Sequence, residues 1–141
     1  MTSSAPRLAE PRDIDACAAI YQAAASLAFP WLPPEAISGD QLLADLREEE
    51  LWVAEREGMV AGFVSIYLPE RVVHSLYVHP LHHRRGIGRD LLTLALQRCG
   101  GHAELKCQEG NRQAAFFYTQ LGWQPVDWGW STAGAWIRYR R

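Results

Sequence analysis

The sequence predicts a mixed α/β fold in which a central, mostly antiparallel sheet is flanked by about four helices. Helical and strand patterns alternate in the order βααβββαβαββ, and two of the strand pairs are hairpins. A length of 141 residues corresponds to one domain, over residues 5–141, and 48% hydrophobic residues are enough to bury a full core. No linker, repeat or low-complexity tract divides the chain.

Each element of the first half has a local signal. Residues 5–10 predict a first short strand, Asp13 is a cap for a first helix, and Ser38 opens a second helix. A hairpin of residues 51–56 and 59–68 turns at Glu57-Gly58, and a strand over 71–78 follows. The inward faces of the two helices are Ile14, Cys17, Ala18 and Tyr21 in the first, and Leu42, Leu43 and Leu46 in the second.

The second half alternates helices and strands before a closing hairpin. A helix over 86–99 ends at Gly100-Gly101, and residues 103–108 predict the next strand. Asn111 is an N-cap for another helix, which stops at Gly122. Residues 124–130 and 135–140 form the final hairpin.

The turn between strand 71–78 and helix 86–99 has the features of a phosphate cradle. Gly86 and Gly88 remove side chains where a ligand could meet the backbone, and the N–H groups of a helix start favour an anion. Fixed positive charge comes from Arg84, Arg85 and Arg89. The turn is neither a P-loop nor a dinucleotide fingerprint, because no Lys follows Gly88 and Leu91 stands where a third glycine is needed. The simpler interpretation is a glycine turn with solvated arginines.

Two motifs together resemble the GNAT superfamily, the GCN5-related N-acetyltransferases. That family carries an Arg/Gln-x-x-Gly-x-Gly/Ala loop and an Asn-x-x-Ala-x-x-Phe-Tyr-x-x-x-Gly-Phe helix. This chain matches with His83-x-x-Gly86-x-Gly88, and with Asn111, Ala114, Phe117, Tyr118, Gly122 and Trp123. His83 and Trp123 depart from the usual residues. The resemblance covers nearly the whole chain and implies a GNAT-like fold with a twisted central sheet.

The resemblance implies acetyl-CoA as co-substrate and nominates residues for it. The pyrophosphate would lie on the backbone of residues 84–89, and the strand edge at Leu76, Tyr77 and Val78 would bond the pantetheine amides. A backbone N–H near Val78 would polarise the thioester carbonyl. The full set is Leu76, Tyr77, Val78, His83, Arg84, Arg85, Gly86, Ile87, Gly88, Arg89, Asn111, Ala114 and Phe117.

Tyr118 and His74 are the candidate catalytic residues. Tyr118 matches the family's general acid, which protonates the departing CoA sulfur; the alternative is a core tyrosine. The related ribosomal-protein acetyltransferases use a Glu base five residues before the motif Asn, and Lys106 stands there in this chain. His74, two residues before Leu76, is our candidate base, because imidazole titrates near neutral pH. Ordered water is the alternative base, and a strand histidine without a catalytic role is the alternative for His74.

The predicted reaction is direct attack of a primary amine on acetyl-CoA, without a covalent enzyme intermediate. The rigid loop over residues 29–34 favours a small-molecule acceptor, with Phe29 and Trp31 in its pocket. Alternatives are a protein or peptide N-acetyltransferase and a non-catalytic acyl-CoA sensor. Trp128, Trp130 and Trp136 are either ordinary packing or further pocket walls.

The remaining features limit cofactors, partners and compartment. A net charge of −2 argues against a general nucleic-acid binder, and we expect no membrane span and no metal. His79, His82 and His83 lie close enough in sequence for a metal, but no Cys or carboxylate is nearby. Three cysteines predict buried free thiols and a cytoplasmic protein. Edge strands of the last hairpin could pair in a homodimer.

Overall fold

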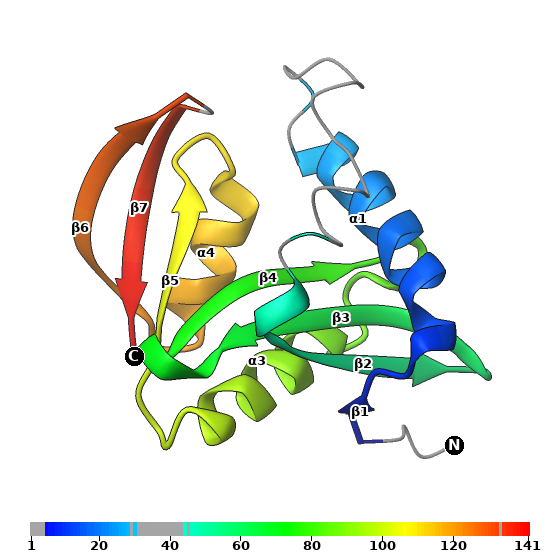
Figure 1. Cartoon of the computed structure of the whole chain (residues 1–141). Coiled ribbons are helices and arrows are strands. Elements are labelled where there is room, and N and C mark those ends of the chain that lie inside the picture. Colours follow the sequence, from blue (N-terminus) through cyan, green and yellow to red (C-terminus); the bar gives the residue numbers. More distant parts are fainter. Residues whose placement is uncertain (1–4, 29, 31–43, 45, 133) are drawn as a thin grey trace.

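The computed structural model describes residues 5–28, 30, 44, 46–132 and 134–141. Seven strands form one sheet in the order β1-β2-β3-β4-β5-β7-β6 (Figure 1). The strands are β1 (Arg7–Leu8), β2 (Glu50–Arg56), β3 (Met59–Tyr67), β4 (Val72–Val78), β5 (Glu104–Gln108), β6 (Gln124–Ser131) and β7 (Gly134–Arg140). The mixed α/β prediction is confirmed, and every predicted strand is present.

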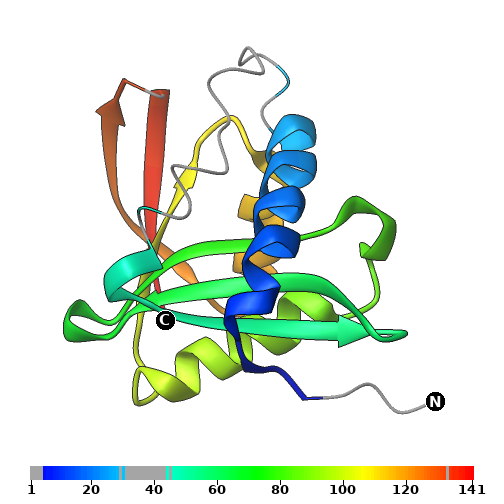
Figure 2. The ribbon, with the colours of Figure 1, turned by 45° about the vertical axis from the view of Figure 1, so that its right-hand side comes forward.

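Helices cover both faces of the sheet (Figures 1 and 2). The α-helices of the described residues are α1 (Ile14–Ala28), α3 (Ile87–Arg98) and α4 (Arg112–Gln120). The predicted helix opened by Ser38, and the loop with Phe29 and Trp31, lie outside the described residues. In the part of the chain that is described, no helix is both long and apolar enough to span a bilayer.

Two apolar cores lie on opposite faces of the sheet. Helix α3 contributes Ile87, Leu91 and Leu92 to the larger core, against which α4 also packs. Helix α1 contributes Cys17 and Ile20 to the smaller core. All three cysteines are buried and free, as predicted.

The sheet opens between β4 and β5. All neighbouring strands are antiparallel except this pair, which is parallel and matches only Val72 with Glu104 and Val73 with Leu105. Beyond Val73 the two strands diverge, as Figure 1 shows. A β-bulge lies at the same point, because Ser65 and Ile66 of β3 match Ser75 and Val73, so that His74 is the extra residue. The bulge therefore bends β4 where β5 leaves it.

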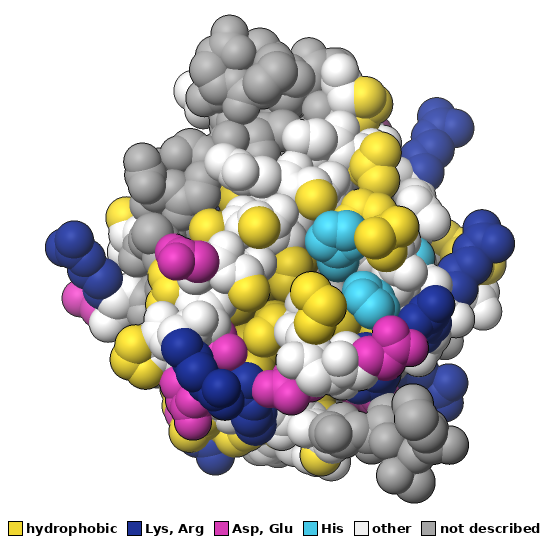
Figure 3. Space-filling view, turned by 90° about the vertical axis from the view of Figure 1, so that its right-hand side faces the viewer, with side chains coloured by type: hydrophobic (Ala, Val, Ile, Leu, Met, Phe, Trp, Pro, Cys, Tyr) yellow, Lys and Arg dark blue, Asp and Glu magenta, His cyan; other side chains and the backbone are white. Residues whose placement is uncertain are grey.

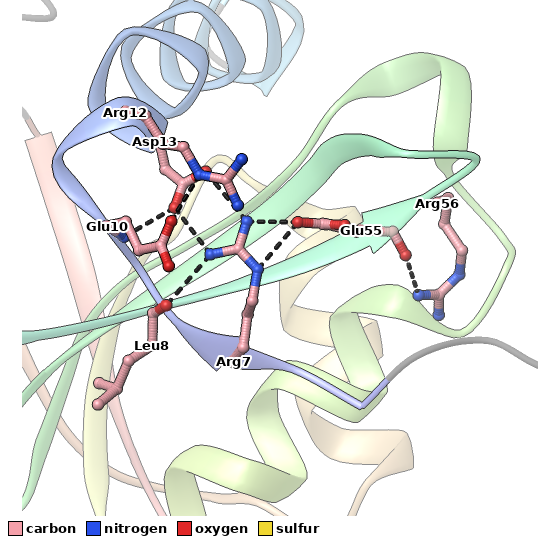
Figure 4. A network of polar contacts seen from close by, with 7 residues as sticks. All are labelled: Arg7, Leu8, Glu10, Arg12, Asp13, Glu55 and Arg56. Atoms are coloured by element: carbon pink, nitrogen blue, oxygen red, sulfur yellow. Dashed lines mark hydrogen bonds and ion pairs between the residues drawn. The ribbon is translucent and has the colours of Figure 1, made fainter.

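The start of α1 is tied to the sheet by a buried carboxylate (Figure 4). Asp13 is 4% exposed and accepts hydrogen bonds from Arg7 Nη1 at 2.8 Å and from the Glu10 N–H at 2.7 Å. Arg7 also donates to Glu55 of β2 at 2.9 Å. The hydrogen bond from Arg7, more than any other cause, lowers the pKa of Asp13 to about 2. Our expectation that Asp13 is the cap before the helix was wrong: it ends a 3-10 turn (Pro11–Asp13), and its side chain reaches back to Glu10.

Candidate functional site

The opening between β4 and β5 exposes backbone groups of β4. The His79 N–H donates to the Ala61 carbonyl of β3 at 2.8 Å. Alternate residues of an antiparallel strand direct their backbone groups to the same neighbour, so Tyr77 faces β3 while Leu76 and Val78 face the opening. Two of the three strand residues nominated from sequence therefore direct their backbone N–H groups into the opening, where a ligand could bind them. The backbone of Tyr77 faces away, and its ring packs 5.8 Å from Phe63 and 5.0 Å from Tyr21.

The first turn of α3 has the geometry of an anion site. The Asp90 N–H makes the first hydrogen bond of the helix, to the Gly86 carbonyl at 3.0 Å. The N–H groups of residues 87–89 therefore have no acceptor within the helix and can bind an anion. Arg84, Arg85 and Arg89 are exposed, and no ion pair within the described residues engages them. Backbone donors, the helix dipole and unpaired guanidinium groups therefore meet at one place.

Gly86 and Gly88 serve this turn in different ways. Gly86 has φ +80°, and a Cβ there would meet nothing within 4 Å, so the position needs left-handed backbone and leaves open space for a ligand. A Cβ on Gly88 would lie 3.3 Å from Phe117 Cζ and 3.6 Å from Val78 Cγ2. Gly88 therefore has a packing role besides the one predicted, because its missing side chain lets α3 pack against α4 and β4.

Two histidines of the connection before α3 already have backbone partners. His83 Nε2 donates to the Val78 carbonyl at 3.0 Å, which ties the cradle to the end of β4. His79 Nδ1 accepts from the Leu81 N–H at 3.1 Å. Figure 3 shows histidine side chains gathered on the face that carries this connection. Among the described residues, no group of three His, Cys, Asp or Glu side chains could hold a metal ion.

Helix α4 brings Tyr118 to the core beside the opening. Asn111 caps this helix as predicted, because its Oδ1 accepts from the Ala114 N–H at 3.1 Å. The Tyr118 ring lies 5.4 Å from Phe117 and 5.7 Å from Tyr139. Its hydroxyl has no hydrogen-bond partner within the described residues, so this proton is available to a ligand.

The surroundings of Tyr118 keep its phenol protonated. Burial raises the pKa of Tyr118, and the neighbouring Cys107, Tyr77 and Tyr139 raise it further. A phenol with a raised pKa carries its proton at neutral pH, which is the state that a proton donor needs.

His74 stands at the rim of a hollow on the α1 face of the sheet. The hollow has a volume of about 260 Å³ and is lined by Glu48, Glu49, Tyr67, Glu70, Val72 and His74. Val73 points into the core beneath α3, so Val72, which precedes it, points to the α1 face. His74 is half exposed, and its Nδ1 lies 2.8 Å and 3.0 Å from the two carboxylate oxygens of Glu49.

Glu49 was missed by sequence analysis. It belongs to the run Glu48-Glu49-Glu50, in which no pattern separates the three carboxylates. Glu50 binds Arg98, with Oε2 2.6 Å from Nη2, whereas Glu49 binds His74, 25 residues away. Only their contacts with side chains far along the sequence distinguish them.

The tryptophans of the last hairpin differ in their packing. Trp128 is 61% exposed and Trp130 is 79% exposed, so neither packs in the core. Trp136 lies over Gly129, with the Lys106 ammonium 4.4 Å from its ring centroid. Lys106 therefore packs on the sheet surface rather than serving as a proton acceptor.

Comparisons with known proteins identify the family of the chain. The model of the acetyltransferase (GNAT) family matches residues 16–123. The peptidyl-lysine N-acetyltransferase YiaC of Escherichia coli (strain K12) is 37% identical over 87 residues, which cover 62% of this chain and 58% of that protein. The L-amino acid N-acyltransferase MnaT of the same organism is 29% identical over 129 residues, which cover 81% of this chain and 75% of that protein.

A solved structure shares the whole fold. The PaiA N-acetyltransferase of Thermoplasma acidophilum, crystallised in complex with coenzyme A, superposes with a TM-score of 0.80 at 15% identity and covers 100% of both chains. At this identity the likeness establishes the fold alone.

Proposed function

Because the chain belongs to the acetyltransferase (GNAT) family, we propose that it transfers the acetyl group of acetyl-CoA to a primary amine. The observation that carries this proposal is the opening between β4 and β5, whose β4 edge ends beside the first turn of α3. A ligand with a chain of amides and a pyrophosphate suits both parts, because free strand amides bond an extended chain and a helix start bonds an anion. The related fold that was crystallised with coenzyme A supports this assignment.

Residues around the opening have distinct roles in the proposed transfer. Acetyl-CoA supplies an acetyl group activated as a thioester. The Val78 N–H faces the opening and polarises the thioester carbonyl. Tyr118, protonated because burial raises its pKa, gives its proton to the sulfur as the carbon–sulfur bond breaks, and its phenolate then regains a proton from the second N–H that the nitrogen loses as the amide forms.

The amine needs a proton acceptor. An alkylamine titrates near ~10, so it is mostly protonated at neutral pH and must lose a proton before its nitrogen can attack. His74 takes this role in our proposal, since it lines the hollow on the α1 face at the point where β5 leaves β4. Ordered water is the alternative acceptor.

Direct transfer is favoured over an acyl-cysteine intermediate. Burial raises the pKa of Cys107 to about 11 and that of Cys17 to about 12. The thiolate is the reactive form of cysteine, and a buried thiol with such a pKa is almost wholly protonated at neutral pH. The amine nitrogen therefore attacks the thioester of acetyl-CoA directly. The acetyl group is at no point bonded to the protein.

The acceptor is a small amine in the first candidate function and a lysine side chain of a protein in the second. The relative MnaT is an L-amino acid N-acyltransferase, which supports the first. The relative YiaC is a peptidyl-lysine N-acetyltransferase, which supports the second, although the chain spans only 58% of that protein.

One screen separates these candidates. Release of CoA thiol from acetyl-CoA is measured with L-amino acids, polyamines, aminoglycosides, and blocked peptides that carry either a free lysine or a free N-terminus. Turnover with free amino acids or polyamines supports the first function, and turnover with lysine peptides alone supports the second. Tight CoA binding without turnover on any amine would instead indicate a sensor.

A further inference from the structure

A buried carboxylate stands behind the exposed imidazole of His74. We propose that Glu49 is a positioning residue, which holds His74 in the tautomer that accepts the proton of the amine. This inference rests on the proposed function for its chemistry. Its structural part, the fixed tautomer, can be tested without any acceptor.

The contact is a three-centre hydrogen bond, sheltered on one side. Both carboxylate oxygens of Glu49 lie within hydrogen-bond distance of His74 Nδ1, at 2.8 Å and 3.0 Å. The Glu49 side chain is 5% exposed, whereas that of His74 is 47% exposed. A carboxylate only accepts hydrogen bonds, so the proton of the neutral ring lies on Nδ1. Nε2 then carries the lone pair and has no partner within the described residues.

The backbone places this pair at the divergence of the strands. Glu49 directly precedes β2, and His74 is the bulged residue of β4, directly after the last residue that pairs with β5. A bulge re-aims a side chain that regular pairing would otherwise fix. The hydrogen bond that His74 Nδ1–H donates to Glu49 therefore supplies the orientation that the irregular strand does not.

The charges around the ring suit proton transfer. Glu48, Glu49, Glu70 and Tyr67 line the hollow beside His74. When Nε2 takes a proton from the amine, the ring becomes a cation with Nδ1–H still bound to Glu49, and a carboxylate in hydrogen bond with an imidazolium stabilises it. The half-exposed ring then passes the proton to solvent, which restores the starting tautomer.

The test compares Glu49→Gln, His74→Ala and the double variant. With an accepting amine from the screen, we expect Glu49→Gln to lower kcat about 10- to 100-fold with the acetyl-CoA KM unchanged, and the double variant to be no slower than His74→Ala. Glu49→Asp keeps the charge and should restore part of kcat. The matched control is Glu104→Gln, which removes the carboxylate of β5 that binds Arg140 of β7. Its kcat and KM should equal those of the wild type.

A second readout is the ring tautomer, measured by long-range proton–nitrogen NMR correlations of His74. We expect the Nδ1–H form in the wild type and in Glu104→Gln, and a mixture of tautomers in Glu49→Gln. Thermal melts of each variant confirm that the measured protein is folded.

Two results would overturn the inference. One is an unchanged tautomer in folded Glu49→Gln. The other is a loss of kcat in the double variant equal to the product of the two single losses, which would mean that Glu49 acts apart from His74. Absence of turnover in the wild type would count against the proposed function alone, because the tautomer measurement would still report on the pair.

Discussion

The buried carboxylate of Asp13 predicts a pH-dependent part of the stability. Asp13 and Arg7 join the start of α1 to the sheet, and the hydrogen bond from Arg7 is the main reason that the pKa of Asp13 falls from its ordinary 3.8 to about 2. A fall of about 1.8 at about 1.36 kcal/mol per pKa unit corresponds to about 2.4 kcal/mol. Asp13→Asn should therefore lower the free energy of unfolding by about 2 kcal/mol at pH 7.

The direction in which this stabilisation changes with pH follows from the lowered pKa of Asp13. A carboxylate with a lower pKa in the folded state binds fewer protons there than in the unfolded chain, so its stabilisation is complete above about pH 4. It is lost as the pH falls toward 2, where the folded state also takes up the proton. The difference between wild type and Asp13→Asn should thus shrink steadily from pH 4 to pH 2.

Urea unfolding followed by tryptophan fluorescence measures this difference at pH 7, 4 and 3. Asp127→Asn is the control, since its side chain is 55% exposed and its contact with Arg138 is 3.7 Å; it should change stability by less than about 0.5 kcal/mol. An Asp13→Asn difference that is near zero at pH 7, or equal at pH 7 and pH 3, would refute the reasoning.

Three further predictions concern the proposed CoA site. Gly88→Val should weaken CoA binding at least tenfold by pressing on Phe117 and so on α4, and an unchanged dissociation constant in calorimetry would contradict this packing. Gly86→Ala should cost about 1–2 kcal/mol in a thermal melt, because the position is left-handed and otherwise open; no loss would mean that the turn has another conformation. Tyr118→Phe should lower kcat about 100-fold without changing the acetyl-CoA KM or the melting temperature, and a large stability loss with unchanged kcat would make it a core residue instead.

Local signals in the sequence predicted most of the fold. The turn at Glu57-Gly58 needs two residues with positive φ, and both have it, at +57° and +79°. Asn111 caps α4 through a bond that spans three residues. Such features depend on neighbours in the chain, so a single sequence contains them.

Features that depend on distant segments were not predictable in the same way. Glu49 is one of three consecutive glutamates, and what sets it apart is its hydrogen bond with His74, on a strand 25 residues away. The close packing at Gly88 depends on a ring of α4, and the hydrogen bonding of Asp13 depends on Arg7 of the sheet. In each case the residue type was visible in the sequence, but the partner was fixed only by tertiary packing.

The most direct test of the proposed function is one reaction in which both products are counted. Acetyl-CoA and the amine panel are incubated with the purified protein, CoA thiol is titrated, and the acetylated amine is quantified by mass spectrometry. We expect equal amounts of CoA and N-acetyl product, at a rate that falls with Tyr118→Phe and Glu49→Gln. Thiol release without an N-acetyl product, or CoA binding with no release on any amine, would contradict the assignment of the chain as an N-acetyltransferase.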